Sequence, residues 1–93
     1  MSEEPIEAPR ITPAQIEAVI EREEYYRFPD TTVTICLLHL VNGFSVVGES
    51  ACVSPANFIA EVGQAIAKEN AKQKIWALEG YALAERLWMG VRN

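Results

Sequence analysis

The pattern of hydrophobic and polar positions is most regular over residues 31–52, TTVTICLLHLVNGFSVVGESAC. Two runs rich in β-branched and large apolar residues flank Asn42-Gly43. Such residues favour strands, and Asn-Gly is the strongest short signal for a two-residue hairpin turn. The sequence therefore predicts an antiparallel β-hairpin with strands over about 31–41 and 44–52.

A two-residue turn would place Val41 opposite Phe44, and this register assigns the faces of the hairpin. Because side chains alternate along a strand, Leu38, Leu40 and Val47 would share one face. Two helices from so short a chain can cover one face of a hairpin comfortably, but not both. We therefore expect a second protomer or another partner to cover this one. The apolar end of the chain adds Trp88 to the predicted oligomer interface.

Helix signals precede the hairpin. Thr12-Pro13-Ala14-Gln15 combines an N-cap, a proline at the first helical position and a capping-box glutamine. We expect a helix from Pro13 to about Tyr25, ended by Pro29. Glu23 and Glu24, near its end, would lie in solvent, which we favour, or opposite the lysines of the next helix. Residues 1–10 are acidic and poor in apolar groups, which predicts a flexible tail before a single domain over 11–93.

The same signals recur after the hairpin, where Ser54-Pro55 predicts a second helix starting at residue 55. Its apolar stripe stops at a polar run over 68–74 and then resumes. A straight helix over 55–89 would be ~52 Å long, against a diameter of ~32 Å for a compact domain of this size. Either the helix bends near 76–80, which we favour, or its second half reaches another subunit. The predicted fold class is α+β, with the order α-β-β-α.

Composition narrows the choice of partners. The 93 residues carry a formal charge of −5 and no basic cluster larger than Lys68, Lys72 and Lys74, which makes duplex nucleic acid a poor ligand. No segment approaches the ~20 apolar residues that span a bilayer. Cys36 and Cys52 would lie on opposite faces of the hairpin, so we expect two free thiols. These features predict a cytoplasmic protein without a membrane partner.

Residue chemistry predicts a protein that is not an enzyme and has no cofactor. His39 is the single histidine, and the predicted register separates it from both cysteines, so neither a nucleophilic dyad nor a metal site forms. Side chains with an apolar body and a polar tip are the candidates for ligand binding. They are Glu49, Asn57, Trp76, Glu79 and Tyr81. The alternatives are core packing for the helical group and, for Glu49, a charge that guards a strand edge.

Several short motifs occur in an order typical of one family. They are Glu24-Tyr25, Phe28-Pro29, Thr31-Thr32, Cys36, Asn42-Gly43-Phe44, Gly48-Glu49-Ser50-Ala51-Cys52, Asn57-Phe58, Gly63, Ala67, Asn70-Ala71, Lys74-Ile75-Trp76 and Glu79-Gly80-Tyr81. Over roughly residues 16–87 the chain resembles a small family of tailed-phage proteins, named after phage gene product forty-nine and gene sixty-six.

The resemblance implies a phage origin and a role in the cytoplasm of an infected bacterium, and it supplies no activity. One hypothesis is an oligomeric sponge, in which Trp76, Tyr81 and polar neighbours enclose a nucleotide-type immune signal. The alternative is an inhibitor of a host protein that docks through its acidic first helix and its exposed apolar face.

Overall fold

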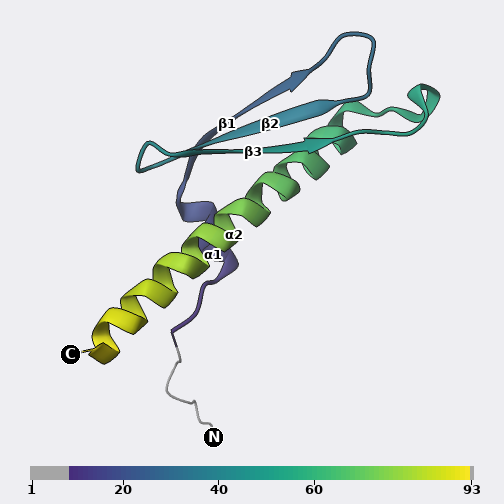
Figure 1. Ribbon diagram of the computed structural model, residues 1–93. Coiled ribbons are helices and arrows are strands. Elements are labelled where there is room, and N and C mark those ends of the chain that lie inside the picture. The colour runs from purple at the N-terminus through teal and green to yellow at the C-terminus, as the bar shows by residue number, and fades with distance from the viewer. Residues whose placement is uncertain (1–8, 93) are drawn as a thin grey trace, which may run out of the picture.

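The computed structural model describes residues 9–92 as a three-stranded antiparallel sheet with helices on one face (Figure 1). In chain order the elements are α1 (Pro13–Ala18), β1 (Ile20–Arg27), β2 (Thr34–Leu40), β3 (Ser45–Ser50), a 3-10 turn η1 (Pro55–Asn57) and α2 (Ala60–Arg92). The strand order is β1-β2-β3. The predicted α+β class is confirmed. The predicted tail over 1–10 lies outside the described residues except for its last two.

The first helix is much shorter than predicted, because β1 replaces its second half. The predicted capping box is present: the Thr12 N–H donates to Gln15 Oε1 at 2.8 Å, and the Gln15 N–H donates to Thr12 Oγ1 at 3.2 Å. Residues 20–27 then pair with β2 along its whole length. Their two tyrosines suit a strand, and the open edge of β2 supplies backbone partners that no local pattern reveals. The expected helix to Tyr25 is therefore wrong.

The hairpin is present, but its register differs from the predicted one by one residue. Leu37 pairs with Val47, and Leu38 pairs with Val46. The loop has three residues instead of two, since Gly43 adopts φ +91° and the Leu40 N–H donates to the Phe44 carbonyl at 2.8 Å. A three-residue loop of this kind places its glycine in the left-handed region. The shift exchanges the faces of β3, so Val47 turns away from Leu38.

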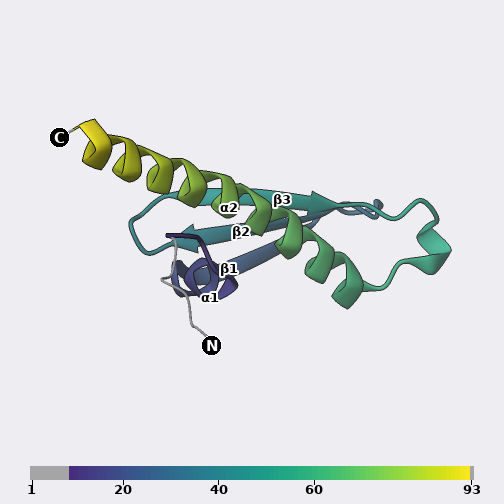
Figure 2. The ribbon, with the colours of Figure 1, turned by 90° about the horizontal axis from the view of Figure 1, so that it is seen from below.

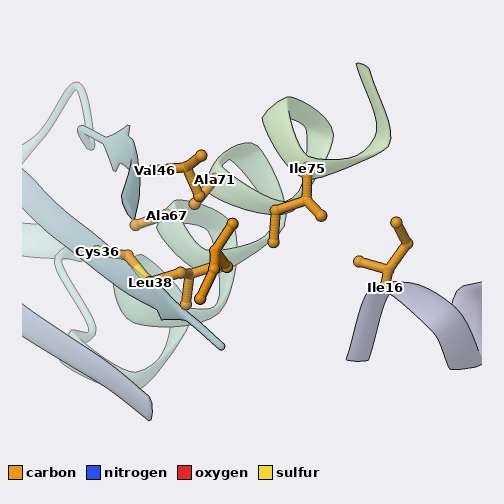
Figure 3. Close-up of a cluster of buried hydrophobic side chains, with 8 residues drawn as sticks. Ile16, Cys36, Leu38, Val46, Ala67, Ala71 and Ile75 are labelled. Carbon is orange, nitrogen blue, oxygen red and sulfur yellow. The ribbon is translucent and has the colours of Figure 1, made fainter. Parts of the chain in front are cut away.

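The inner face of the sheet packs against α2 and α1, and Figure 3 shows this core. Its buried apolar members are Ile16, Cys36, Leu38, Leu40, Val46, Ala67, Ala71 and Ile75. Leu38 and Leu40 are only 0% and 7% exposed, so the prediction that they await a partner is wrong. Val47 lies on the outer face and is 38% exposed.

Gly48 allows α2 to lie directly on β3. A Cβ atom at this position would stand 2.2 Å from the carbonyl oxygen of Ala67 and 2.2 Å from the backbone nitrogen of Ala71. Asn70, on the neighbouring turn, donates from Nδ2 to the Glu49 carbonyl at 2.7 Å. Three small residues and one side-chain hydrogen bond therefore set how closely the helix approaches the sheet.

Two ion pairs join α2 to the acidic residues before it. Lys68 Nζ lies 3.0 Å from Glu23 Oε2, and Lys72 Nζ lies 2.5 Å from Glu17 Oε2. Glu23 was expected in solvent and instead faces a lysine, whereas Glu24 pairs with Arg22 and His39. The Lys72 ammonium lowers the pKa of Glu17 below its usual value.

The long helix begins later than predicted and does not bend. Residues 55–57 form the 3-10 turn η1, where the Ser54 side chain makes no capping hydrogen bond, and α2 starts at Ala60. From there 33 residues continue to Arg92, which at 1.5 Å per residue is roughly 50 Å. The bend expected near 76–80 is absent. Figure 1 shows the C-terminal half of α2 leaving the sheet, and the molecule measures 56 × 34 × 20 Å.

Candidate functional site

A hollow lies at the N-terminal end of α2. It has a volume of about 230 Å³ and sits between the end of β3, the segment 51–58 and the first two turns of the helix. Its lining is mainly apolar with a few polar side chains. The lining residues are Thr32, Ser50, Ala51, Cys52, Asn57, Phe58, Ile59, Val62, Gly63 and Ile66.

Hydrogen bonds from two polar side chains hold the walls of this pocket together. Ser50 donates from Oγ to the Gly63 carbonyl at 2.7 Å, which ties the end of β3 to α2. Thr32 donates from Oγ1 to the Cys52 carbonyl at 2.6 Å and accepts the Cys52 N–H at 3.0 Å. The pocket is therefore built from segments that hold one another in place, as a preformed site requires.

A cation lies beside the pocket. The guanidinium carbon of Arg27 stands 4.1 Å from the centre of the Phe58 ring, which is a cation–π contact. Arg27 also donates from Nε to the Thr31 carbonyl at 2.9 Å. The guanidinium is thus held in position while most of its donors still face outward.

The start of α2 adds a second positive feature. The Gly63 N–H donates to the Ile59 carbonyl at 3.0 Å, which makes Ile59 the N-cap, and its aliphatic side chain cannot accept a hydrogen bond. Within the described chain, the N–H groups of residues 60–62 therefore have no capping side chain. They carry the positive end of a long helix dipole, which Glu61 in the first turn offsets in part.

Neither cysteine is placed as a nucleophile. Cys36 is fully buried, and burial raises the pKa of its thiol. Cys52 donates its S–H to the Ser54 carbonyl at 3.0 Å, and both residues are free thiols, as expected. A thiol becomes reactive where its pKa is lowered, which is the opposite of the environment of Cys36.

His39 lies on the outer face of the sheet, away from both cysteines. Its Nε2 stands 2.8 Å from Glu24 Oε2, and Arg22 contacts the same carboxylate. The hydrogen bonds from Arg22 and then His39 lower the pKa of Glu24. Across residues 9–92, no cluster of three or more histidine, cysteine, aspartate or glutamate side chains is placed to hold a metal ion.

The five predicted ligand-binding residues do not meet within one chain. Asn57 lines the pocket. Trp76 packs partly buried against the core, and Glu79 lines a separate hollow near the hairpin turn. Tyr81 is 71% exposed on the projecting half of α2. Glu49 lies on the outer face of β3, on the opposite side from Cys36, whereas the predicted register had placed the two together.

Arg27 and Phe58 are the site residues that the sequence did not reveal. They lie 31 positions apart in the chain, and their contact depends on how β1 and the segment before α2 come together. A sequence signal for the pair would have required recognising residues 20–27 as a strand.

The comparisons with known proteins identify a family. A model of the Phage protein (N4 Gp49/phage Sf6 gene 66) family matches residues 11–87. The chain belongs to this family of phage proteins. No curated protein and no solved structure matches it. This match confirms the family resemblance that the sequence motifs of the phage protein indicated. The family description names no activity. Within the described part of this phage protein, no helix is long and apolar enough to span a membrane.

Proposed function

We propose that this phage protein is a non-enzymatic accessory protein that acts in the host cytoplasm and neutralises a host defence factor by binding it. The proposed ligand is a nucleotide-type immune signal, held by an assembly of several copies. The observation that carries the proposal is the pocket at the start of α2. An aromatic ring, that of Phe58, lines this apolar hollow, and the Arg27 guanidinium over that ring and the positive end of α2 lie beside it.

Each part of a nucleotide has a counterpart in this pocket. A phosphate suits the free N–H groups of residues 60–62 and the guanidinium of Arg27, because both present donors to an anion. A base suits the apolar wall formed by Phe58 and Val62. A ribose suits the amide of Asn57 and neighbouring hydroxyl groups. The net charge of −5 does not oppose this, since the two local cationic features dominate at short range.

The size of the pocket supports an assembly. Its volume of about 230 Å³ is smaller than the ~300 to 1,000 Å³ of sites that enclose whole small ligands. One chain would therefore cover only part of a dinucleotide. The projecting half of α2 carries exposed apolar residues that another copy would cover, among them Tyr81 and Trp88.

The alternative proposal, an inhibitor that docks on a host protein, has less support. Its acidic helix is reduced to six residues. Glu17 and Glu23 each pair with a lysine of α2, which neutralises the acidic surface on that side. The outer sheet face, with Tyr26 and Val47 exposed, is the surface that such an inhibitor would use.

Thermal unfolding with a panel of cyclic dinucleotides and cyclic ADP-ribose isomers tests the proposal. A ligand present at a hundred times its Kd stabilises the folded state by about 2.7 kcal/mol, so a clear rise in Tm is expected for at least one member. Arg27→Gln should abolish that rise. Arg22→Gln, which removes the same charge from the outer face of β1, should retain it.

Three results would contradict the proposal. A flat response across the panel, together with capture of one stoichiometric host protein, would favour the inhibitor. Equal loss of the Tm rise in both arginine variants would place the ligand elsewhere. Turnover of any panel member would make the protein an enzyme.

A further inference from the structure

The two edges of the sheet differ in how well they are protected. β1 has the sequence IEREEYYR, with five charged side chains and an irregularity in its pairing between Ile20 and Arg22. Charges and irregular pairing are the usual protection of an exposed strand edge. β3 has the sequence SVVGES, in which four consecutive uncharged residues precede Glu49. The β3 edge is therefore open to another strand.

The backbone of β3 has hydrogen-bonding groups pointing outward. Because Phe44 bonds to Leu40, the alternation of an antiparallel ladder turns residues 46, 48 and 50 toward β2 and residues 45, 47 and 49 away from it. Of the outward groups in the described chain, only the Glu49 carbonyl has a partner, the amide of Asn70. An edge of this kind pairs readily with an added strand.

An open groove runs along the same edge. It has a volume of about 400 Å³ and lies between β3 and the middle of α2. Its lining residues are Phe44, Ser45, Val46, Val47, Lys74, Ala77 and Leu78. In Figure 2 α2 crosses the sheet obliquely, and its C-terminal half lies beyond the β3 edge. The strand edge and the projecting helix thus border the same space.

Four exposed apolar residues point to this side, three from α2 and one from the position just before it. Ile59, Ile66, Tyr81 and Trp88 are 57%, 48%, 71% and 51% exposed. At 3.6 residues per turn they fall within an arc of about 60°. Asn70, which reaches the β3 edge, lies in the same arc. The stripe has large residues toward both ends and small or polar residues in the middle, so it can pack against an antiparallel copy of itself.

We propose that a second copy of this chain occupies the β3 edge, related to the first by a two-fold axis beside Val47. Val47 then pairs with Val47 of the second copy, and Ser45 pairs with Glu49, so no like charges face one another. The result is a six-stranded sheet. This inference specifies the assembly on which the proposed function rests.

The same axis brings the helices together. Lys74 lies beside Val47 in the groove, so the two α2 helices run antiparallel and pass closest near this turn. Residues at nearly equal distances before and after Lys74 then face one another across the two helices. Ile66 lies eight residues before Lys74 and Tyr81 lies seven residues after it, so Ile66 contacts Tyr81 of the second copy. Ile59 lies 15 residues before Lys74 and Trp88 lies 14 residues after it, so Ile59 contacts Trp88 of the second copy in the same way.

The length of the exposed stripe fits a helix pair. Ile59 and Trp88 lie 29 residues apart, which is roughly 44 Å along a helix. A contact of about that length and ~10 Å wide, with the strand edge, buries on the order of 1,000 Å² in total, near the lower limit for a specific interface.

The dimer completes the pocket. Ile59 and Ile66 line the hollow at the start of α2, so residues that pack against them from the second copy also close that hollow. Tyr81 of the second copy supplies an aromatic ring and a hydroxyl group at its open side. Asn57 and Tyr81, which one chain keeps apart, would thus serve one site across the interface.

Sedimentation or light scattering across a concentration series tests the dimer. The expected mass is twice 10.4 kDa. Tyr81→Glu should raise the dimer dissociation constant about a hundredfold, because it buries an unpaired charge. Leu87→Glu is the matched control, since Leu87 is also exposed, at 46%, but lies about 120° from Tyr81 around the helix. Both sites are exposed, so circular dichroism should show the same fold.

The strand edge is tested separately. Val47→Lys places two ammonium groups side by side at the two-fold axis and should also yield monomers, whereas Tyr26→Lys on β1 should leave the dimer intact. A monomeric wild-type protein, an odd number of subunits, or equal effects of Tyr81→Glu and Leu87→Glu would overturn the inference.

Ligand binding separates this inference from the proposed function. A dimer that binds no member of the nucleotide panel leaves the interface standing and contradicts the function. A monomer that binds one contradicts the interface and leaves the function standing.

Discussion

The two halves of α2 differ in apolar content and in surroundings: five of the 13 residues over 63–75 are apolar, against eight of the 12 residues over 78–89. Over Gly63 to Ile75 the helix lies on the sheet, with Ala67 and Ala71 fully buried against Gly48. Over Leu78 to Met89 it carries larger apolar side chains, and most of them are about half exposed. The comparison teaches that small side chains let a helix pack closely where a sheet lies beside it. Large apolar side chains stay exposed where no sheet lies beside them.

The difference also explains the shape of the molecule. Strands of six to eight residues are at most ~27 Å long, whereas α2 is roughly 50 Å. The sheet can therefore cover only about half of the helix. The Cα radius of gyration is 17.4 Å, against about 12 Å expected for a compact chain of this length.

Gly48→Ala should break the packed half. The added methyl group would collide with helix backbone, which cannot rotate away as a side chain can. We expect a loss of about 3 kcal/mol or more in the free energy of unfolding, at the upper end of overpacking effects. Urea titration followed by circular dichroism measures it.

Gly80→Ala is the matched control on the projecting half. Nothing lies within 4 Å of a Cβ at Gly80, and the residue sits inside a continuous helix. The same substitution should therefore stabilise the protein by up to about 1 kcal/mol through helix propensity. Destabilisation by Gly80→Ala would mean that the helix bends there after all.

Truncating one large side chain in each half of α2 should give the next largest change in the free energy of unfolding. Ile75 is 1% exposed in the core, so Ile75→Ala should cost about 2 to 4 kcal/mol. Leu87→Ala, at 46% exposure, should cost less than about 0.5 kcal/mol in the same urea titration. Similar losses for the two variants would show that the second half is buried in solution.

Removing the ion pair between Lys68 and Glu23 in the packed half should give the smallest change in the free energy of unfolding. Hydrogen bonds from Tyr25 and then Lys68 lower the pKa of Glu23. A carboxyl whose pKa is lowered by folding contributes stability above its unfolded pKa of about 4.3, and this is lost as the pH falls through the folded value. Glu23 is 37% exposed, so Lys68→Gln should cost only about 0.5 to 1 kcal/mol at pH 7.

That cost should shrink as the pH falls below the unfolded pKa and through the lowered folded pKa, because the Glu23 carboxylate is then protonated in both states. Urea titrations at pH 7 and pH 3 measure the change. Arg86→Gln, which removes a cation from the projecting half, is the control and should show no such pH dependence. A cost for Lys68→Gln that is equal at both pH values would rule out the ion pair as its cause.

Local patterns predicted some elements and not others. The hairpin and the first helix start depend on turn and capping chemistry within a few residues, and the Thr12 capping box formed as expected. The second helix start was misplaced, because the Ser54 side chain makes no cap and residues 55–57 form a 3-10 turn. Residues 20–27 were expected to be helical, and they form a strand because β2 offers a full ladder of backbone partners. The register of β3 followed from loop geometry at Gly43, which an Asn-Gly pair alone does not specify.

The candidate site was predicted only in part. Asn57 was identified from the sequence. The free N–H groups of residues 60–62 were not, because the second helix begins five residues later than expected. The guanidinium of Arg27 over Phe58 was missed, because it joins two segments far apart in the chain. Leu38 and Leu40 were assigned to an interface because β1 and the position of α2 were unknown.

By itself, the sequence determined the α+β class, the hairpin, the absence of a paired thiol and the membership in a phage protein family. These depend on local propensity and on the order of short motifs. Only the tertiary structure decided which apolar face is covered, how α2 lies on Gly48 and where Arg27 meets Phe58. Burial and close contact depend on surfaces brought together from distant parts of the chain, and no local pattern encodes which surfaces those are.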